Sequence, residues 1–245
     1  MSSKNSNSTR SKPVVASPAK NTYLLAYNAL SAALWAGVLY QTVTIGAHEV
    51  DTARKSGAFF GGQNSLKAIQ TGLSSGKVFS ELDHYTRLTQ SLAGLEVLHS
   101  LLGIVRAPLF TTLMQVASRF LLVWGIAFPF PQSTQHSPAY STMLLAWSVT
   151  EVIRYSYFVF NLSGIGVPKL WTWLRYNTFL VLYPLGIASE CWLVYNAIPL
   201  AQMLREEYGW ALWAILAIYV PGSYVLFTHM LKQRRRVGRE PPVKR

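Results

Sequence analysis

The chain has 245 residues, of which 51% are hydrophobic and only 13% are charged, and its formal net charge at pH 7 is +12. Soluble domains average about 25% charged residues, and the apolar residues here come in long blocks rather than at amphipathic spacing. These features exclude an ordinary soluble domain and predict a polytopic membrane protein. The single cysteine, Cys191, excludes a disulfide within the chain and a cysteine metal cluster.

The excess of positive charge lies largely in two tails. Eleven of the 22 basic residues fall there, four in residues 1–21 and seven in residues 232–245. Such a charge suggests nucleic acid in a soluble chain, but beside a membrane it fixes topology and meets anionic lipid headgroups. We therefore expect a disordered basic tail at 1–21, a membrane domain at 22–231 and a basic tail at 232–245, with no nucleic-acid partner.

Six apolar stretches follow one another along the chain. They cover about residues 22–45, 85–105, 109–128, 139–162, 178–197 and 209–231. Each is close to the ~20 residues that a membrane-spanning helix needs. A Gly/Ser-rich connection at 46–84 separates the first two, and its middle, 65–72, predicts a short surface helix. The predicted fold is all-α, a bundle of six transmembrane helices.

The charges on the connections predict the orientation. With six spans both ends lie on one side, which also receives both basic tails, Arg106 and the basic segment from Arg154 to Arg175. The opposite side carries loops whose charges balance or are absent. By the positive-inside rule we expect both termini in the cytosol and residues 46–84 on the lumenal side.

Five ionisable residues fall in the middle of the predicted spans, where a charge is costly unless it is paired or faces water. They are Glu96, His99, Arg119, Glu151 and Arg154. One interpretation is structural, with pairs Glu151–Arg154 and Glu96–Arg119 neutralising each other inside the bundle. The other is that these side chains line a polar cavity that opens to the cytosol.

The fifth span holds a carboxyl group with no basic residue within two turns of it on its own helix, Glu190. Tyr183 lies seven residues earlier, so the two side chains share one helix face about 10 Å apart along the axis. Pro184 and Gly186, between them, can break or kink the helix. A phenol and a carboxyl on one face of a broken helix predict a proton-transfer site.

A second motif runs from His99 and Ser100 to Arg106 and has the spacing of the tyrosine-phosphatase signature His-Cys-x5-Arg. The nucleophilic cysteine is replaced by Ser100, and phosphatase chemistry needs a thiolate. The stretch also lies in a predicted apolar helix, where no phosphate-binding loop forms. The sequence therefore argues against phosphatase activity.

Three stretches resemble the very-long-chain (3R)-3-hydroxyacyl-CoA dehydratases, the protein-tyrosine-phosphatase-like A family. They are LEVLHSLLGIVRAPLFTTLMQVASR at 95–119, LLAWSVTEVIRYSYFVFNL at 144–162 and LRYNTFLVLYPLGIASE at 174–190. The resemblance extends over about residues 22–232. It implies a six-span enzyme of the endoplasmic-reticulum membrane that performs the third step of fatty-acid elongation, with Tyr183 and Glu190 as its catalytic residues.

The implied reaction matches what the residues offer. Forming a trans-2-enoyl thioester requires removal of a C2 proton and protonation of the departing C3 hydroxyl, so a general base and a general acid suffice without metal or cofactor. The sequence leaves open which of Tyr183 and Glu190 is the base. Further candidates for orienting the thioester or binding CoA are Glu96, His99, Arg119, Glu151, Arg154, Arg175, Tyr176 and Asn177. The implied partners are a long-chain 3-hydroxyacyl-CoA, membrane lipid, and the condensing and reducing enzymes of the elongation cycle.

The alternative function is non-enzymatic: a small transporter, or a scaffold subunit of a lipid-synthesis complex. Intramembrane charges and a broken fifth helix are features of transporters too. Against this alternative, the two halves of the chain show no inverted repeat that we can detect.

Overall fold

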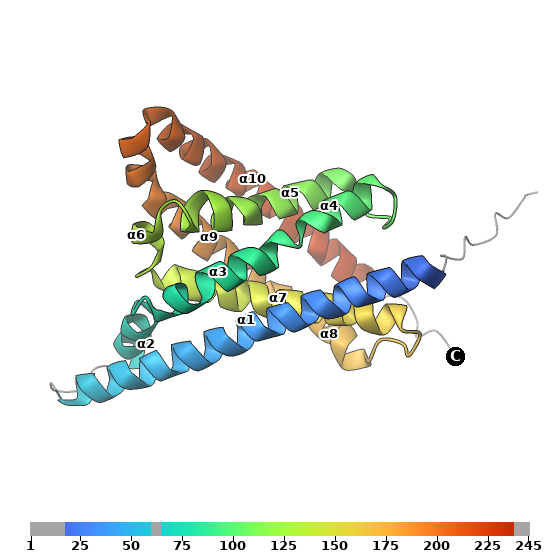
Figure 1. Cartoon of the computed structure of the whole chain (residues 1–245), viewed down its shortest axis with the longest axis horizontal. Helices are drawn as coiled ribbons and strands as arrows, with labels where there is room; N and C mark the ends of the chain where they lie inside the picture. The colour runs from blue at the N-terminus through green and yellow to red at the C-terminus, as the bar shows by residue number, and fades with distance from the viewer. Residues whose placement is uncertain (1–17, 60–64, 238–245) are drawn as a thin grey trace, which may run out of the picture.

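The computed structural model describes residues 18–59 and 65–237, and every regular element in that part of the chain is a helix (Figure 1). This confirms the predicted all-α class. In chain order the elements are α1 Pro18–Phe59, α2 Ser65–Leu73, α3 Lys77–Ser91, α4 Gly94–Leu101, α5 Leu109–Phe120, the π-helix η1 Leu121–Ala127, α6 Pro131–Thr134, α7 Pro138–Leu162, α8 Lys169–Asn177, α9 Phe179–Leu204 and α10 Glu206–Val237.

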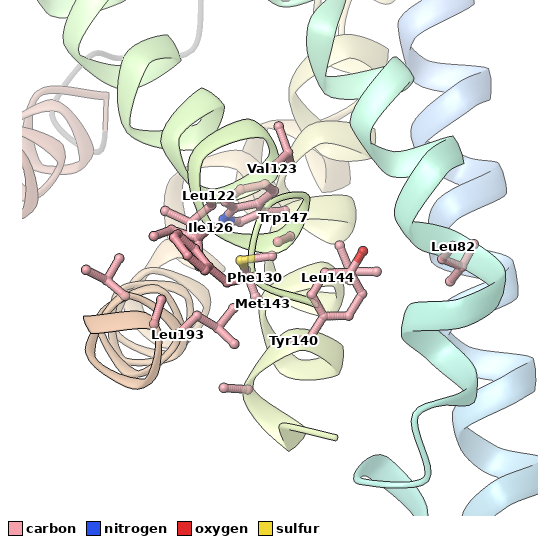
Figure 2. Packing of buried hydrophobic residues seen from close by; sticks show 14 of the residues in the cluster. Leu82, Leu122, Val123, Ile126, Phe130, Tyr140, Met143, Leu144, Trp147 and Leu193 are labelled. Atoms are coloured by element: carbon pink, nitrogen blue, oxygen red, sulfur yellow. The ribbon is translucent and has the colours of Figure 1, made fainter. Parts of the chain in front are cut away.

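Helix α7 organises the packing. It lies against α1, α3, α8 and α9, and α9 in turn packs against α10. The core therefore forms where η1, α7 and α9 meet. Figure 2 shows Trp147 of α7 lying among Leu122, Val123 and Ile126 of η1, all of them almost fully buried.

Four segments of the described chain are long and apolar enough to cross a membrane. They are Pro18–Gly57 in α1, Leu109–Ala127 in α5 and η1, and the whole of α9 and α10. The other two predicted spans fall on the α3–α4 pair, which is interrupted, and on α7, which is 25 residues long but carries Glu151 and Arg154. The membrane-protein class follows from the four apolar helices, and the count of six stays a prediction.

Helix α1 is longer than the predicted first span. It begins at Pro18 rather than Thr22 and continues to Phe59, so the first part of the expected 46–84 connection is helical. Residues after Gly46 favour this, because no proline interrupts them and Lys55 pairs with Asp51 one turn away, N to O 2.6 Å. The short helix predicted at 65–72 is confirmed as α2.

The second and third predicted spans depart from regular α-helix. A turn at Leu92 and Ala93 separates α3 from α4, and the carbonyl oxygen of Leu92 accepts a hydrogen bond from the hydroxyl of Tyr27 at 3.2 Å. Gly94 follows directly, and glycine weakens a helix at this point. The third span ends in the π-helix η1, a form that is rare and concentrated at functional sites.

The fifth span is unbroken, which corrects the expected interruption. Helix α9 runs continuously from Phe179 to Leu204 with Pro184 and Pro199 inside it. A proline removes one backbone donor without ending a helix when neighbouring helices hold the segment in place. The packing of α9 against α7 and α10 supplies that support.

Side-chain contacts show which segments share an end of the molecule. At one end, Asn21 donates to the carbonyl of Leu162 at 3.2 Å and Arg234 donates to Asn177 at 3.0 Å. These contacts bring the start of α1, the end of α7, α8 and the end of α10 together. At the other end, Ser141 of α7 donates to the carbonyl of Leu73 at 3.4 Å. The tails before residue 18 and after residue 237 lie outside the described residues.

Candidate active site

Glu190 lies where three helices meet, and its residue is only 6% exposed. Its Oε1 accepts the indole N–H of Trp147 in α7 at 2.8 Å, and its Oε2 accepts the hydroxyl of Tyr219 in α10 at 3.0 Å. The carboxylate of α9 is therefore held by one donor from each of two other helices. The sequence prediction missed both partners, because hydropathy counts Trp147 and Tyr219 simply as apolar span residues.

Gly186 lies beside the carboxylate at the contact between α9 and α7. It lies one turn before Glu190 on α9, and a Cβ atom there would lie 3.9 Å from Oε1 of Glu190 and 3.7 Å from the Cβ of Ala146. Small residues at a helix contact let two backbones approach each other closely within a membrane. Gly186 and Ala146 thus lie at the α7–α9 contact beside Glu190, with room there for a methyl group.

Tyr183 faces α10 rather than forming a hydrogen bond with Glu190. Its hydroxyl donates to the backbone carbonyl of Ser223 at 3.1 Å, and its ring stacks on Phe227 with centroids 5.8 Å apart. Glu190 also contacts α10, through the hydroxyl of Tyr219 one helical turn before Ser223. The helix face that Tyr183 and Glu190 share is therefore directed toward α10, and their shared role in catalysis stays a prediction.

A charge network joins α4, α5 and α7. Glu151, 2% exposed, accepts hydrogen bonds from Arg119 of α5 and from Nε of Arg154 at 2.7 Å. The other guanidinium nitrogens of Arg154 donate to both oxygens of Glu96 at 2.8 and 2.7 Å. The pair Glu151–Arg154 is confirmed, whereas the pair Glu96–Arg119 is wrong: Glu96 pairs with Arg154 and Arg119 pairs with Glu151.

Aromatic side chains complete the α4 end of this network. Tyr155 donates to Oε1 of Glu96 at 2.5 Å, and the hydroxyl of Tyr27 lies 3.5 Å from the same oxygen. The Nε2 atom of His99 hydrogen-bonds to the hydroxyl of Tyr23 in α1 at 2.8 Å. Helix α1 therefore supplies phenols to the network, a contribution that the sequence did not indicate.

Arg119 connects the charge network to Glu190. Its guanidinium carbon lies 5.1 Å from the ring centroid of Trp147, whose N–H binds the carboxylate. The guanidinium of Arg119 that lies over Trp147 is ion-paired with Glu151.

Arg175, Tyr176 and Asn177 lie apart from Glu190, on α8. The guanidinium of Arg175 lies over the rings of Tyr157 and Phe158, at 4.5 and 4.9 Å from their centroids. Asn177 ends α8, whereas Glu190 lies 13 residues later, within α9. These three residues belong to the end of the molecule where α1 begins and α10 ends.

Neither a phosphatase site nor a metal site can be built from the described residues. Ser100, at the cysteine position of the phosphatase-like signature, donates to the carbonyl of Ala107 at 2.8 Å and so closes the turn after α4. No group of three or more His, Cys, Asp or Glu side chains in the described ranges is placed to hold a metal ion.

An apolar groove of about 610 Å³ lies between α1 and the α3–α4 junction. Leu34, Tyr85, Leu88 and Leu95 are among its lining residues, and neither Glu190 nor any partner of its carboxylate is among them. The groove is therefore lined by other residues than the candidate site around Glu190.

Comparison with known proteins finds one matching family and several similar sequences. The family described as "Protein tyrosine phosphatase-like protein, PTPLA" matches residues 90–240. A probable very-long-chain (3R)-3-hydroxyacyl-CoA dehydratase from Schizosaccharomyces pombe is 41% identical, over 92% of this chain and 97% of its own length. The dehydratase PASTICCINO 2 from Arabidopsis thaliana is 36% identical over 89% of this chain and 93% of its own, and dehydratase 2 from Homo sapiens is 29% identical over 90% and 82%. No solved structure matches the chain. The chain belongs to the protein tyrosine phosphatase-like, PTPLA, family.

Proposed function

We propose that this protein is a very-long-chain (3R)-3-hydroxyacyl-CoA dehydratase, a hydro-lyase that forms the trans-2-enoyl-CoA during fatty-acid elongation. Relatives that match it over most of its length carry that name. One observation at the site carries the proposal: the carboxylate of Glu190 is buried and accepts hydrogen bonds from Trp147 and Tyr219. Glu190 lies on α9, the helix that also carries Tyr183.

The contacts of the two groups support different roles for them. An indole N–H can only donate, so Oε1 of Glu190 is an acceptor. A backbone carbonyl can only accept, so the hydroxyl of Tyr183 is a donor. We therefore assign Glu190 as the general base and Tyr183 as the general acid, a choice that the sequence left open.

The reaction then balances in one exchange of protons. Glu190 takes the proton from C2, and the electrons of that C–H bond form the C2=C3 double bond. The C3–O bond breaks, and the departing oxygen takes the phenolic proton of Tyr183 to leave as water. Because the two side chains do not hydrogen-bond to each other, water must carry the proton from Glu190 back to Tyr183 to restore both groups, and one water is lost for each substrate.

The charge network has a structural role in this proposal. Glu96 and Glu151 each form an ion pair with Arg154. Removing one partner of such a buried pair is strongly destabilising, because it leaves the other charge uncompensated. Arg119 lies over the ring of Trp147, whose indole N–H binds Glu190. We propose that the network fixes α4, α5 and α7, so that Trp147 stays in position beside Glu190.

The CoA end of the substrate would meet the end of the molecule that carries α8. Arg175, Tyr176 and Asn177 lie there, beside the basic last turn of α10. Guanidinium groups are suited to bind phosphate oxygens. We propose that this end faces the cytosol, that the chain crosses the endoplasmic-reticulum membrane six times, and that it works beside the other elongation-cycle enzymes.

The test is a dehydratase assay of the purified protein in detergent. A long-chain (3R)-3-hydroxyacyl-CoA is supplied, and the trans-2-enoyl-CoA product is measured by mass spectrometry against a heat-treated control. We expect turnover, with a preference that emerges across a series of chain lengths. Absence of product at every chain length would favour the transporter or scaffold alternatives, since neither forms the enoyl product.

A further inference from the structure

We propose that Tyr219 is a third member of the proton-transfer site, a positioning residue that fixes the catalytic carboxylate through its second oxygen. This inference rests on the proposed dehydratase function. It concerns a residue of α10 that lies 29 positions from Glu190 in the chain and whose hydroxyl contacts Oε2 at 3.0 Å.

The first argument is geometric. A carboxylate with a single hydrogen bond can still rotate about its last side-chain torsion, which has a broad energy minimum. Here Trp147 holds Oε1 from α7 while Tyr219 holds Oε2 from α10. Two donors from two helices fix the plane of the carboxylate, and such fixed orientation is a large part of catalytic efficiency.

The second argument concerns the chemistry of the two donors. The indole of Trp147 can only donate, so Oε1 is held in one permanent arrangement. The phenol of Tyr219 can donate or accept, so its hydrogen bond to Oε2 survives when Glu190 gains a proton. The Tyr219 side of the carboxylate is therefore the side that tolerates a change of protonation during turnover.

The third argument is the position of Tyr219 on α10. Ser223 follows it by one helical turn, about 6 Å along the axis, and the carbonyl of Ser223 accepts the hydroxyl of Tyr183. One turn of α10 thus contacts both proposed catalytic side chains of α9. If Tyr219 only filled space, its hydroxyl would not have to contact the carboxylate of Glu190.

The experiment compares Tyr219→Phe with Tyr224→Phe. Tyr224 is on the same helix but is 70% exposed, so its variant controls for loss of a phenol from α10. We expect Tyr219→Phe to lower kcat by about 10- to 100-fold, the range in which activity falls when the hydrogen-bond partner that orients a metal-binding side chain is removed. KM should change less than about twofold, because the contact is to a catalytic group and not to the substrate. Tyr224→Phe should match the wild type.

A second pair of variants separates positioning from packing. In the Glu190→Gln background, Tyr219→Phe should change the residual rate by less than about twofold, because the carboxylate that it positions is already gone. If Tyr219→Phe folds poorly, Tyr219→His keeps a ring-borne donor and should retain more activity per folded protein than the phenylalanine variant.

Two results would overturn the inference. One is a kcat for Tyr219→Phe equal to that of Tyr224→Phe. The other is a double variant, Tyr219→Phe with Glu190→Gln, whose rate falls by the product of the two single losses. Either result with an active wild type removes Tyr219 from the site and leaves the dehydratase proposal standing. An inactive wild type removes the proposed function and the inference together.

Discussion

Glu190 shows how far the sequence leads at the scale of single residues. Its depth in an apolar helix and the absence of a basic neighbour on that helix single it out as an exception. Its actual partners lie 43 and 29 residues away in the chain. Spacing within one helix says nothing about which side chains the neighbouring helices bring, so Trp147 and Tyr219 became visible only in the fold.

The charge network follows the same rule. Glu151 and Arg154 are three residues apart on α7, and their pairing could be predicted from that spacing. The partner of Glu96 could not be, because Arg119 and Arg154 are both basic residues at a similar depth. In the fold Arg154 of α7 binds both carboxylate oxygens of Glu96.

A prediction follows for Glu151, the centre of this network. Glu151→Gln removes the charge that two guanidinium groups share, and losing one partner of a buried pair costs about 3–5 kcal/mol. We expect a clearly lower Tm in detergent. Asp51→Asn, which breaks an exposed ion pair of α1, is the control and should leave Tm unchanged, because exposed pairs contribute little. Equal Tm values for the two variants would contradict a stabilising network.

At the scale of elements, hydropathy located the helices better than their ends. The predicted spans mark where apolar residues begin and stop, but a helix ends only where its backbone pattern is interrupted. Helix α1 therefore continues past the apolar stretch to Phe59. Conversely, the turn at Leu92 divides the predicted second span, because Gly94 and the hydroxyl of Tyr27 favour a local break there.

The contact between α1 and α2 gives an element-scale prediction. A Cβ atom on Gly72 would lie 2.6 Å from backbone atoms of Val50, which is too close for two atoms that are not bonded to each other. Gly72→Ala should therefore separate α1 from α2 and lower stability by about 1–3 kcal/mol, the usual cost of overpacking. Thermal unfolding in detergent measures this.

The matched control for Gly72 is Gly222→Ala on α10, where an added Cβ meets nothing within 4 Å. Alanine also favours a helix over glycine by about 1 kcal/mol, so this variant should keep or raise Tm. If Gly72→Ala were as stable as Gly222→Ala, the close α1–α2 packing would be wrong.

At the scale of the whole molecule, the contacts that join α1 to α7 and α8 to α10 bring the two ends of the described chain to one side. The charge pattern predicts that this side is cytosolic. Tags placed at residues 1, 60 and 245 should then respond differently to protease in sealed microsomes. We expect cleavage of both terminal tags and protection of the tag at 60. Protection of either terminal tag would contradict the topology.

The central claim is that Tyr183 and Glu190 act as one proton-transfer unit, and its most direct test is the initial rate on a long-chain (3R)-3-hydroxyacyl-CoA, normalised to folded protein. Tyr183→Phe and Glu190→Gln keep shape while removing the transferable proton or the charge. Each should lower the rate by about 10²- to 10⁴-fold. The double variant should lose little more than the worse single one, because residues of one unit are strongly non-additive. A near-normal rate for Tyr183→Phe, or losses that multiply in the double variant, would contradict the claim.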